Sequence, residues 1–318
     1  MVMFPNCRTK GRWTAVLIAA ALASQSPPLM AQTAYKYRDA NGQWVFTDVA
    51  PPPGANGESI ALAHENSKLN ISVIRSDDAG STQFVAVNDC LCVVTFHVQI
   101  TQTSPGATPT RADYRITLQP ATRQTMARIA RTDAASPDLQ YAWRAALGSP
   151  DAAHHPDRPY RVPFGVGSTY LISQAYPSRI THTTAESEYA VDFALPDGTP
   201  VYAAREGTVI NARHDSFQGA VAPIMLDQAN VVEILHSDGT IGVYAHLHWD
   251  SIRVRIGEHI ARGQYIADSG NTGFSAGPHL HFAVIRNAGE ADVSVPVVFA
   301  GLVGDPVTPA TQMPITAY

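Results

Sequence analysis

The sequence predicts an all-β protein. Apolar and polar residues alternate in short runs that are rich in valine, isoleucine and aromatic side chains, a pattern typical of half-buried strands. The 22 glycines and 23 prolines separate many of these runs, and apolar residues rarely recur with the helical period. We therefore expect a C-terminal β-sheet domain over residues 164–310, preceded by a β-rich, sandwich-like accessory domain over residues 80–147.

The composition is that of a globular protein. Hydrophobic residues make up 45% of the 318-residue chain and charged residues 15%, which is enough apolar material for a core and too little charge for a mostly disordered chain. The formal net charge is -5, and no basic stripe is interleaved with aromatic residues. Because nucleic acids bind proteins through such basic surfaces, we expect no nucleic-acid partner.

Residues 1–31 have the pattern of a signal peptide. Three cations stand near the start of this segment: Arg8, Lys10 and Arg12. The apolar run that follows, residues 13–23, is too short at about 1.5 Å per residue to cross a hydrocarbon core of about 30 Å. The segment therefore indicates export rather than membrane anchoring, with cleavage after Ala23 or Ala31. We expect a periplasmic or secreted protein without a transmembrane segment.

Residues 32–60 predict a small N-terminal β-hairpin module. Tyr35 and Tyr37 alternate with polar residues, and Asn41-Gly42 is typical of a two-residue hairpin turn. The stretch resembles a small module found on many bacterial envelope proteins, a likeness that implies little about chemistry.

The accessory domain over residues 80–147 shows no catalytic pattern. Residues 83–100 and 114–118 alternate as strands do, and residues 103–111 read as the loop between them. Cys90 and Cys92 lie in this domain, separated by one residue. We interpret them as two half-buried thiols, with a local disulfide or an intermolecular bridge as alternatives. Proline-rich residues 149–163 indicate a linker.

The C-terminal domain divides into short β runs. Asp197-Gly198 and Asp238-Gly239 are expected to form hairpin-type turns between such runs. Six runs are predicted as strands: residues 189–194, 200–204, 207–214, 230–236, 241–246 and 279–285.

Residues with metal-binding chemistry gather in these predicted strands. His279 and His281 are two residues apart, so on a strand they share one face while Leu280 points to the other. Asp192 is the single acid in an apolar strand, and a buried carboxylate needs a hydrogen bond, an ion pair or a cation. His246 ends another predicted strand. A metal ion would satisfy Asp192 and use the histidines.

Several motifs occur in a fixed order over roughly residues 164–290. They are Asp-Phe-Ala at 192–194, Pro-Asp-Gly-Thr-Pro-Val at 196–201, Asp-Gly-Thr at 238–240, Tyr-Ala-His-Leu at 244–247, Gly-Asn-Thr-Gly at 270–273 and Gly-Pro-His-Leu-His-Phe at 277–282. In this order they resemble the lysostaphin-type zinc metallopeptidases, also called LytM-like murein endopeptidases. The resemblance implies a bent all-β peptidase domain that holds zinc through two histidines and one aspartate.

The resemblance also implies roles for individual residues. It makes Asp192 and His281 zinc ligands, and His246 and His279 the two catalytic histidines. The remaining ligand is open: the commonest family pattern has a histidine where this chain has Glu188, whereas a variant places it farther upstream, as in Thr181-His182. We favour His182 because imidazole suits zinc, with Glu188 as the alternative.

The mechanism implied by this ligand set is metal-assisted peptide hydrolysis. Three protein ligands leave a fourth position for water, whose pKa zinc lowers to about 7. We expect His279 to orient or deprotonate the water, and His246 to stabilise the oxyanion or protonate the leaving amine. The sequence does not fix which histidine has which role.

Three functions remain open at this point. The first is an exported zinc metalloendopeptidase that cuts cross-links or stem peptides of peptidoglycan. The second is a non-catalytic wall-binding activator of a murein amidase, which the filled ligand positions disfavour. The third is a peptidase that acts on secreted proteins. Peptidoglycan peptides are the expected partner, and the N-terminal regions could regulate the enzyme by occluding its groove or docking it on the wall.

Overall fold

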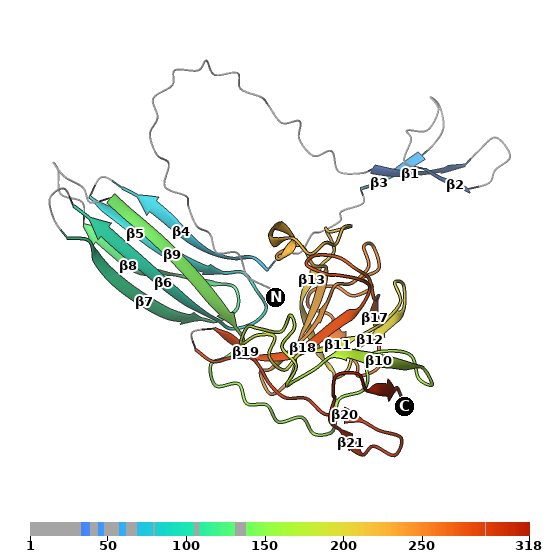
Figure 1. Cartoon of the computed structure of the whole chain (residues 1–318). Helices are drawn as coiled ribbons and strands as arrows, with labels where there is room; N and C mark the ends of the chain where they lie inside the picture. The colour runs from blue at the N-terminus through green and yellow to red at the C-terminus, as the bar shows by residue number, and fades with distance from the viewer. Residues whose placement is uncertain are drawn as a thin grey trace. The chain divides into compact units, whose positions relative to one another are not determined.

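The structure is a computed structural model that describes residues 69–318 except 79, 105–107, 131–137 and 290, together with three strands nearer the N-terminus (Figure 1). These three strands belong to one compact unit and the residues from 69 onward to another. The predicted signal peptide lies outside the described residues. In the part that is described, no helix is long and apolar enough to cross a membrane.

The N-terminal unit contains a three-stranded antiparallel sheet. Strand β1 (Thr33–Arg38) lies in the middle, between β2 (Trp44–Thr47) and β3 (Gly57–Ala61). Strands β1 and β2 pair in the antiparallel way that the predicted hairpin requires. The third strand, β3, was not predicted. The Asn41-Gly42 turn lies outside the described residues.

Two three-stranded antiparallel sheets precede the C-terminal domain. One has the order β4-β5-β8 and the other β7-β6-β9. Their strands are β4 (Ile71–Asp77), β5 (Ser81–Asn88), β6 (Val94–Thr103), β7 (Thr110–Leu118), β8 (Thr122–Ala130) and β9 (Asp138–Leu147). Phe84 from the first sheet and Phe96 from the second belong to one core, so the sheets form a sandwich. Strand β4 begins before the predicted boundary at residue 80.

A nine-stranded antiparallel sheet forms the C-terminal domain. Its order is β16-β13-β14-β15-β18-β11-β10-β22, and β19 also pairs with β18. The strands are β10 (Thr169–Gln174), β11 (Val191–Phe193), β13 (Gly207–Arg213), β14 (Val231–Leu235), β15 (Ile241–Ala245), β16 (His259–Ile260), β18 (Leu280–Asn287), β19 (Asp292–Ser294) and β22 (Pro314–Thr316).

Two short ladders complete the domain. Strand β12 (Pro200–Tyr202) pairs with β17 (Tyr265–Asp268), and β20 (Phe299–Ala300) pairs with β21 (Pro306–Val307). All six predicted strands are present, and the described residues contain one short 3₁₀ helix, Pro223–Met225, and no α-helix. The predicted all-β fold class is therefore confirmed.

One predicted turn was wrong. The chain does turn at Gly198, where φ is 80°. It does not form a hairpin there, because β11 pairs with β10 and β18 while β12 pairs with β17. Tertiary pairing of β11 in the middle of the sheet overrides the local hairpin signal. The Asp238-Gly239 turn does join two paired strands, β14 and β15.

The two faces of the large sheet are covered differently. Leu280, Phe282 and Val284 of β18 point into the core of the C-terminal domain. Ala283 and Ile285 point to the opposite face and share a core with the sandwich. Because side chains alternate along a strand, His281 lies on this same second face. The sandwich thus covers one end of the face that carries His281.

Hydrogen bonds reinforce this contact between the sandwich and the sheet. The Asn287 amide donates to Thr95 Oγ1 at 3.0 Å and to the Gly148 carbonyl at 2.9 Å. The Leu147 N–H donates to the Asp292 carboxylate at 3.0 Å. The segment that the sequence indicated as a linker is itself packed, since Tyr160 is buried in the core of the C-terminal domain.

Candidate metal centre

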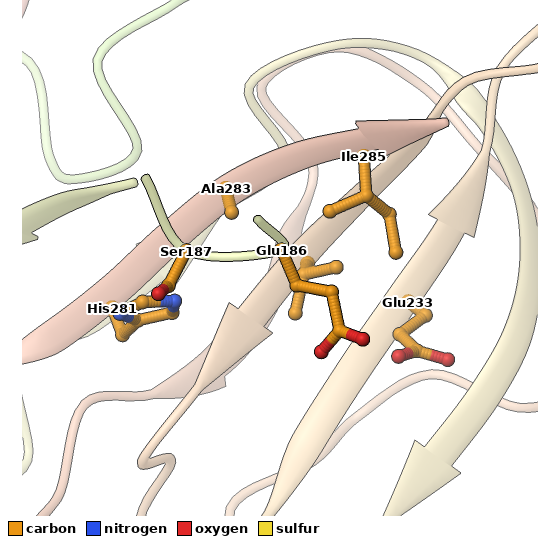
Figure 2. Close-up of a pocket in the computed structure, with 7 residues that line it drawn as sticks. Glu186, Ser187, Glu233, His281, Ala283 and Ile285 are labelled. Atoms are coloured by element: carbon orange, nitrogen blue, oxygen red, sulfur yellow. The ribbon is translucent and has the colours of Figure 1, made fainter. Parts of the chain in front are cut away.

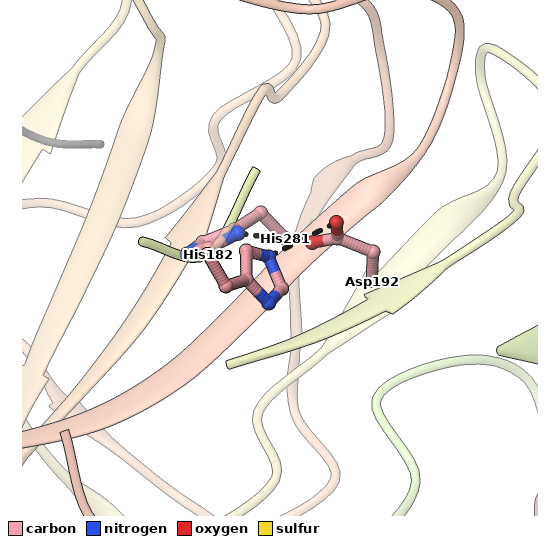
Figure 3. Close-up of side chains that lie close together, drawn as sticks. All are labelled: His182, Asp192 and His281. Atoms are coloured by element: carbon pink, nitrogen blue, oxygen red, sulfur yellow. Dashed lines mark hydrogen bonds and ion pairs between the residues drawn. The ribbon is translucent and has the colours of Figure 1, made fainter. Parts of the chain in front are cut away.

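Asp192 and His281 are brought together by strand register. They lie directly opposite each other on the paired strands β11 and β18, so both side chains point to the same face. His281 Nδ1 is 2.9 Å from Asp192 Oδ1. His182 comes from the loop between β10 and β11, and its Nε2 is 3.1 Å from Asp192 Oδ2 (Figure 3).

These three side chains fit a metal ion. One ligand atom from each lies within 4.8 Å of the others, and all three residues are buried. Both ring nitrogens of His182 are shielded from solvent; Nε2 faces the Asp192 carboxylate, whereas Nδ1 has no hydrogen bond among the described residues. Buried polar atoms of this kind are rare without a partner. Two imidazoles and one carboxylate are a donor set that zinc uses in catalytic sites.

Glu188 does not join this cluster. Its carboxylate accepts a hydrogen bond from Arg179 Nη2 and is paired with that cation. The structure therefore places His182, and not Glu188, beside Asp192 and His281.

The protonation states of the cluster suit metal binding. Burial opposes ionisation of Asp192, but the imidazoles of His182 and His281 outweigh it and hold the pKa of this carboxyl far below its ordinary range. Burial lowers the pKa of His281 to about 4, although Asp192 partly opposes this shift. At neutral pH the carboxylate is ionised and the imidazole is neutral, and these are the forms that bind metals.

His246 and His279 lie side by side next to the cluster. Their ring centroids are 4.5 Å apart, and His279 Nε2 is 4.0 Å from Asp192 Oδ1. His246 Nδ1 is 2.7 Å from the Thr272 carbonyl and His279 Nδ1 is 2.8 Å from the Gly277 carbonyl. Because a carbonyl only accepts, we assign the proton of each ring to Nδ1, which leaves each Nε2 free to accept a proton.

His246 is held in an unusual backbone conformation. It directly follows β15 and has a φ of 62°, a region that residues other than glycine rarely occupy and that recurs at functional sites. Thr272 fixes it there: besides the carbonyl that binds the imidazole, its hydroxyl donates to the Leu247 carbonyl at 2.9 Å. Burial also holds the pKa of His246 well below its ordinary value.

Thr272 is a residue whose role the sequence did not reveal. It lies in the recognised Gly-Asn-Thr-Gly motif, but nothing in the motif shows that its carbonyl binds His246. The following Gly273 has a φ of 79°, and a Cβ there would lie 2.5 Å from Ala229 N. Only glycine fits this close approach, which sets the path of the loop.

One open groove with a volume of about 730 Å³ is lined by the three residues of the metal cluster and by the two neighbouring histidines, His246 and His279. Apolar side chains form part of its walls: Ile180, Val221, Leu226 and Phe274. Of the residues that the structure describes, none from the sandwich lines the groove. The groove thus offers apolar walls beside the metal cluster and the two histidines. The wall residues were not singled out from the sequence.

A small pocket with both polar and apolar lining lies behind His281 (Figure 2). It has a volume of about 20 Å³ and is lined by Glu186, Ser187 and Glu233 as well as His281. Such a space holds about one water molecule. Burial raises the pKa of both Glu186 and Glu233 to about 7. Near neutral pH each of these two carboxyl groups is therefore only partly ionised.

Glu233 was missed although the sequence carries a signal for it. It is the one acid in the apolar strand β14, just as Asp192 is the one acid in β11. It is 1% exposed and accepts a hydrogen bond from Asn211 Nδ2 at 3.1 Å. Both acids are buried and need a partner, and Glu233 finds it in the Asn211 amide and in a proton of its own.

Two family comparisons match different parts of the chain. Residues 186–293 match Peptidase family M23. Residues 18–69 match a domain of unknown function, DUF4124. The first match includes Asp192, His246, His279 and His281, whereas His182 precedes it.

Similar proteins include a peptidoglycan endopeptidase and the antimicrobial peptidase lysostaphin. The chain is 35% identical over 125 residues to peptidoglycan DD-endopeptidase ShyA of Vibrio cholerae, covering 38% of this chain and 26% of that protein. It is 32% identical over 100 residues to lysostaphin of Staphylococcus simulans, covering 31% of this chain and 18% of that protein. The matched parts thus span about a quarter or less of these relatives. The solved catalytic domain of lysostaphin aligns with 30% identity and a TM-score of 0.28, covering 38% of this chain and 80% of that one.

Proposed function

We propose that this chain, whose residues 186–293 match peptidase family M23, is an exported zinc metalloendopeptidase that hydrolyses peptide bonds in peptidoglycan cross-links or stem peptides. The observation that carries the proposal is the grouping of His182, Asp192 and His281 beside His246 and His279 in one groove. The similarity to ShyA and lysostaphin supports peptidoglycan as the substrate.

His182, Asp192 and His281 would hold the zinc ion. When bound, zinc would polarise the scissile carbonyl and make a water molecule easier to deprotonate. The ionised Asp192 and the neutral His281 are already in the forms that bind it. His182, whose imidazole lies beside Asp192 and His281, provides the remaining ligand atom.

His279 is the better placed of the two histidines to take a proton from water. Its Nε2 lies 4.0 Å from Asp192 Oδ1, at the edge of the metal cluster. Its Nδ1 proton is bound by the Gly277 carbonyl, so Nε2 carries the lone pair. A positioned base of this kind accelerates hydrolysis by removing the proton as the water attacks.

His246 would pass to the leaving amine the proton that His279 takes from the water, since the two rings lie side by side with their centroids 4.5 Å apart. Its Nδ1 is tied to the Thr272 carbonyl, so Nε2 is the nitrogen that gains and loses the proton. Because burial holds the pKa of His246 well below its ordinary value, its protonated form is a strong acid. Such an acid gives up its proton readily to an amine.

Export is supported by the leader pattern at residues 1–31, with Arg8, Lys10 and Arg12 before an apolar run. A periplasmic or secreted location would place the enzyme where its substrate lies.

The test is the zinc content and the wall-degrading activity of the purified chain. We expect one zinc per chain in the wild type and in Glu188→Ala, and its loss in His182→Ala and His281→Ala. Purified peptidoglycan should release new peptide ends only with the zinc-loaded forms. A folded wild type without zinc would refute the metalloenzyme and favour a wall-binding activator. Cleavage of casein but not of peptidoglycan would refute the assignment of peptidoglycan as the substrate.

A further inference from the structure

Cys90 and Cys92 face each other inside the sandwich. They lie in the turn between β5 and β6, and their Sγ atoms are 2.7 Å apart. This is a short separation for two thiols that are not bonded. Cys90 is 5% exposed and Cys92 is 1% exposed, so both sulfur atoms are enclosed by protein and face one another rather than solvent.

A buried asparagine holds the turn in this shape. Asn88 is fully buried, and its amide nitrogen donates to the carbonyls of Cys92, Leu118 and Gln119 at 2.9, 3.2 and 2.9 Å. Its amide oxygen accepts from the Cys90 N–H at 3.0 Å. Both ends of the Cys90-Leu91-Cys92 turn are therefore fixed by one side chain, which keeps the two thiols together.

The turn lies against the large sheet. Leu91 Cδ1 is 3.5 Å from the position that a Cβ on Gly257 would occupy. Cys90, Cys92 and Ile210 of β13 belong to the same core. The two thiols therefore lie close to the contact between the sandwich and the C-terminal domain.

The two thiols differ in acidity. The hydrogen bond from Cys92 lowers the pKa of Cys90. The same hydrogen bond, together with burial, raises the pKa of Cys92. Because the thiolate is the reactive form of cysteine, Cys90 is the sulfur that attacks first.

We infer that Cys90 and Cys92 are a redox modification site that closes to an intramolecular disulfide with a low-molecular-weight or protein disulfide as oxidant. The Cys90 thiolate attacks the oxidant, forms a mixed disulfide and releases one thiolate. Cys92 then loses its proton and attacks Cys90 Sγ, which releases the second thiolate. Two cysteines are oxidised, the oxidant is reduced to two thiols, and those thiols take up the two protons.

The geometry requires little movement for this reaction. The sulfur atoms must close from 2.7 Å to the bond length of about 2.05 Å. The hydrogen bonds of Asn88 are to backbone groups, so none is lost when the thiol protons leave. The oxidised protein should therefore keep the fold of the reduced one.

The experiment uses the full chain with Cys7→Ser, so that only the two sandwich cysteines remain. The protein is unfolded, refolded in glutathione buffers that step from reduced to oxidised, quenched with acid and alkylated with N-ethylmaleimide under denaturing conditions. Refolding ensures that the oxidant reaches both sulfurs. In the oxidised buffers we expect a monomer that lacks two hydrogens, carries no adduct and keeps the thermal transition of the reduced protein.

Cys92→Ser is the matched control and should carry one glutathione or one maleimide on Cys90 in every buffer. The inference is overturned if the chain with both cysteines keeps two alkylated thiols at every glutathione ratio. Disulfide-linked dimers, or a bridged monomer that has lost its thermal transition, would overturn it as well. None of these measurements depends on peptidase activity.

Discussion

Asp192 and His281 stand directly opposite each other on β11 and β18, with Asp192 Oδ1 2.9 Å from His281 Nδ1. The pairing of two central strands thus places two of the proposed ligands without help from any loop. His182 is the ligand that a loop must bring to them.

Removing the metal should destabilise the protein. An ion present at about 100 times its dissociation constant stabilises the folded state by about 3 kcal/mol, which for a chain of this size corresponds to about 4–6 °C in the melting temperature. We expect a chelator to lower the melting temperature of the zinc-loaded wild type by that amount. Asp192→Asn should melt at the same temperature with and without chelator. An equal response in both proteins would contradict the assignment of Asp192.

His246→Ala should stop catalysis without releasing the metal. The loss of a positioned proton donor costs about 100- to 10,000-fold in rate. We expect kcat to fall by that factor while the zinc content stays at the wild-type level. His248→Ala changes a histidine two residues away and should keep both the wild-type kcat and the wild-type zinc content. Wild-type turnover by His246→Ala would show that the residue has no role in the chemistry.

Glu233→Gln should make stability less dependent on pH. The pKa of Glu233 is raised to about 7 by burial, so between about pH 4.5 and 7 the unfolded chain loses this proton while the folded chain keeps it. Stability therefore falls as pH rises through this window, by up to about 3 kcal/mol. We expect Glu233→Gln to be more stable than wild type by about 1–3 kcal/mol at pH 8, and the gain to shrink towards pH 4.5.

Urea unfolding at a series of pH values measures this effect. Asp305→Asn, which neutralises an exposed acid, serves as the control and should follow the wild-type curve. If the free energy of unfolding of Glu233→Gln changed with pH in parallel with that of the wild type, the Glu233 carboxyl would have to be ionised in the folded protein.

Asn88→Ala should destabilise the sandwich strongly. The change leaves three carbonyls without their donor, and unsatisfied buried polar groups cost about 1–3 kcal/mol each in the worst case. We expect a loss of about 2–4 kcal/mol in the free energy of unfolding. Asn70→Ala, which removes an exposed bond to Asp89, should change it by less than about 0.5 kcal/mol. Equal effects of the two changes would contradict the role of Asn88.

The sequence was informative where local pattern and burial agree. The six predicted strands carry alternating or continuous apolar residues, and each exists in the structure. Asp192 could be identified because one charge in an apolar strand needs a partner. His279 and His281 could be placed on one face because strand periodicity is two residues.

Other features depend on tertiary contacts that no local pattern encodes. Strand β16 has only two residues, too few to show a period. The carbonyl of Thr272 binds His246 from 26 positions along the chain, and backbone atoms leave no trace in the residue type. The packing of Ile285 against the sandwich could not be told from burial in its own domain, because both require the same apolar side chain.

The shared core has a consequence for dissecting the protein. A fragment that begins at the predicted linker would lose the sandwich and present Ile210, Ile241 and Ile285 to water, and newly exposed apolar surface of this kind promotes aggregation. Asn287 and Asp292 would also lose their partners across the contact. The smallest soluble piece that contains the groove should therefore start upstream of β4, and a truncation series should show a sharp drop in soluble yield once that strand is cut.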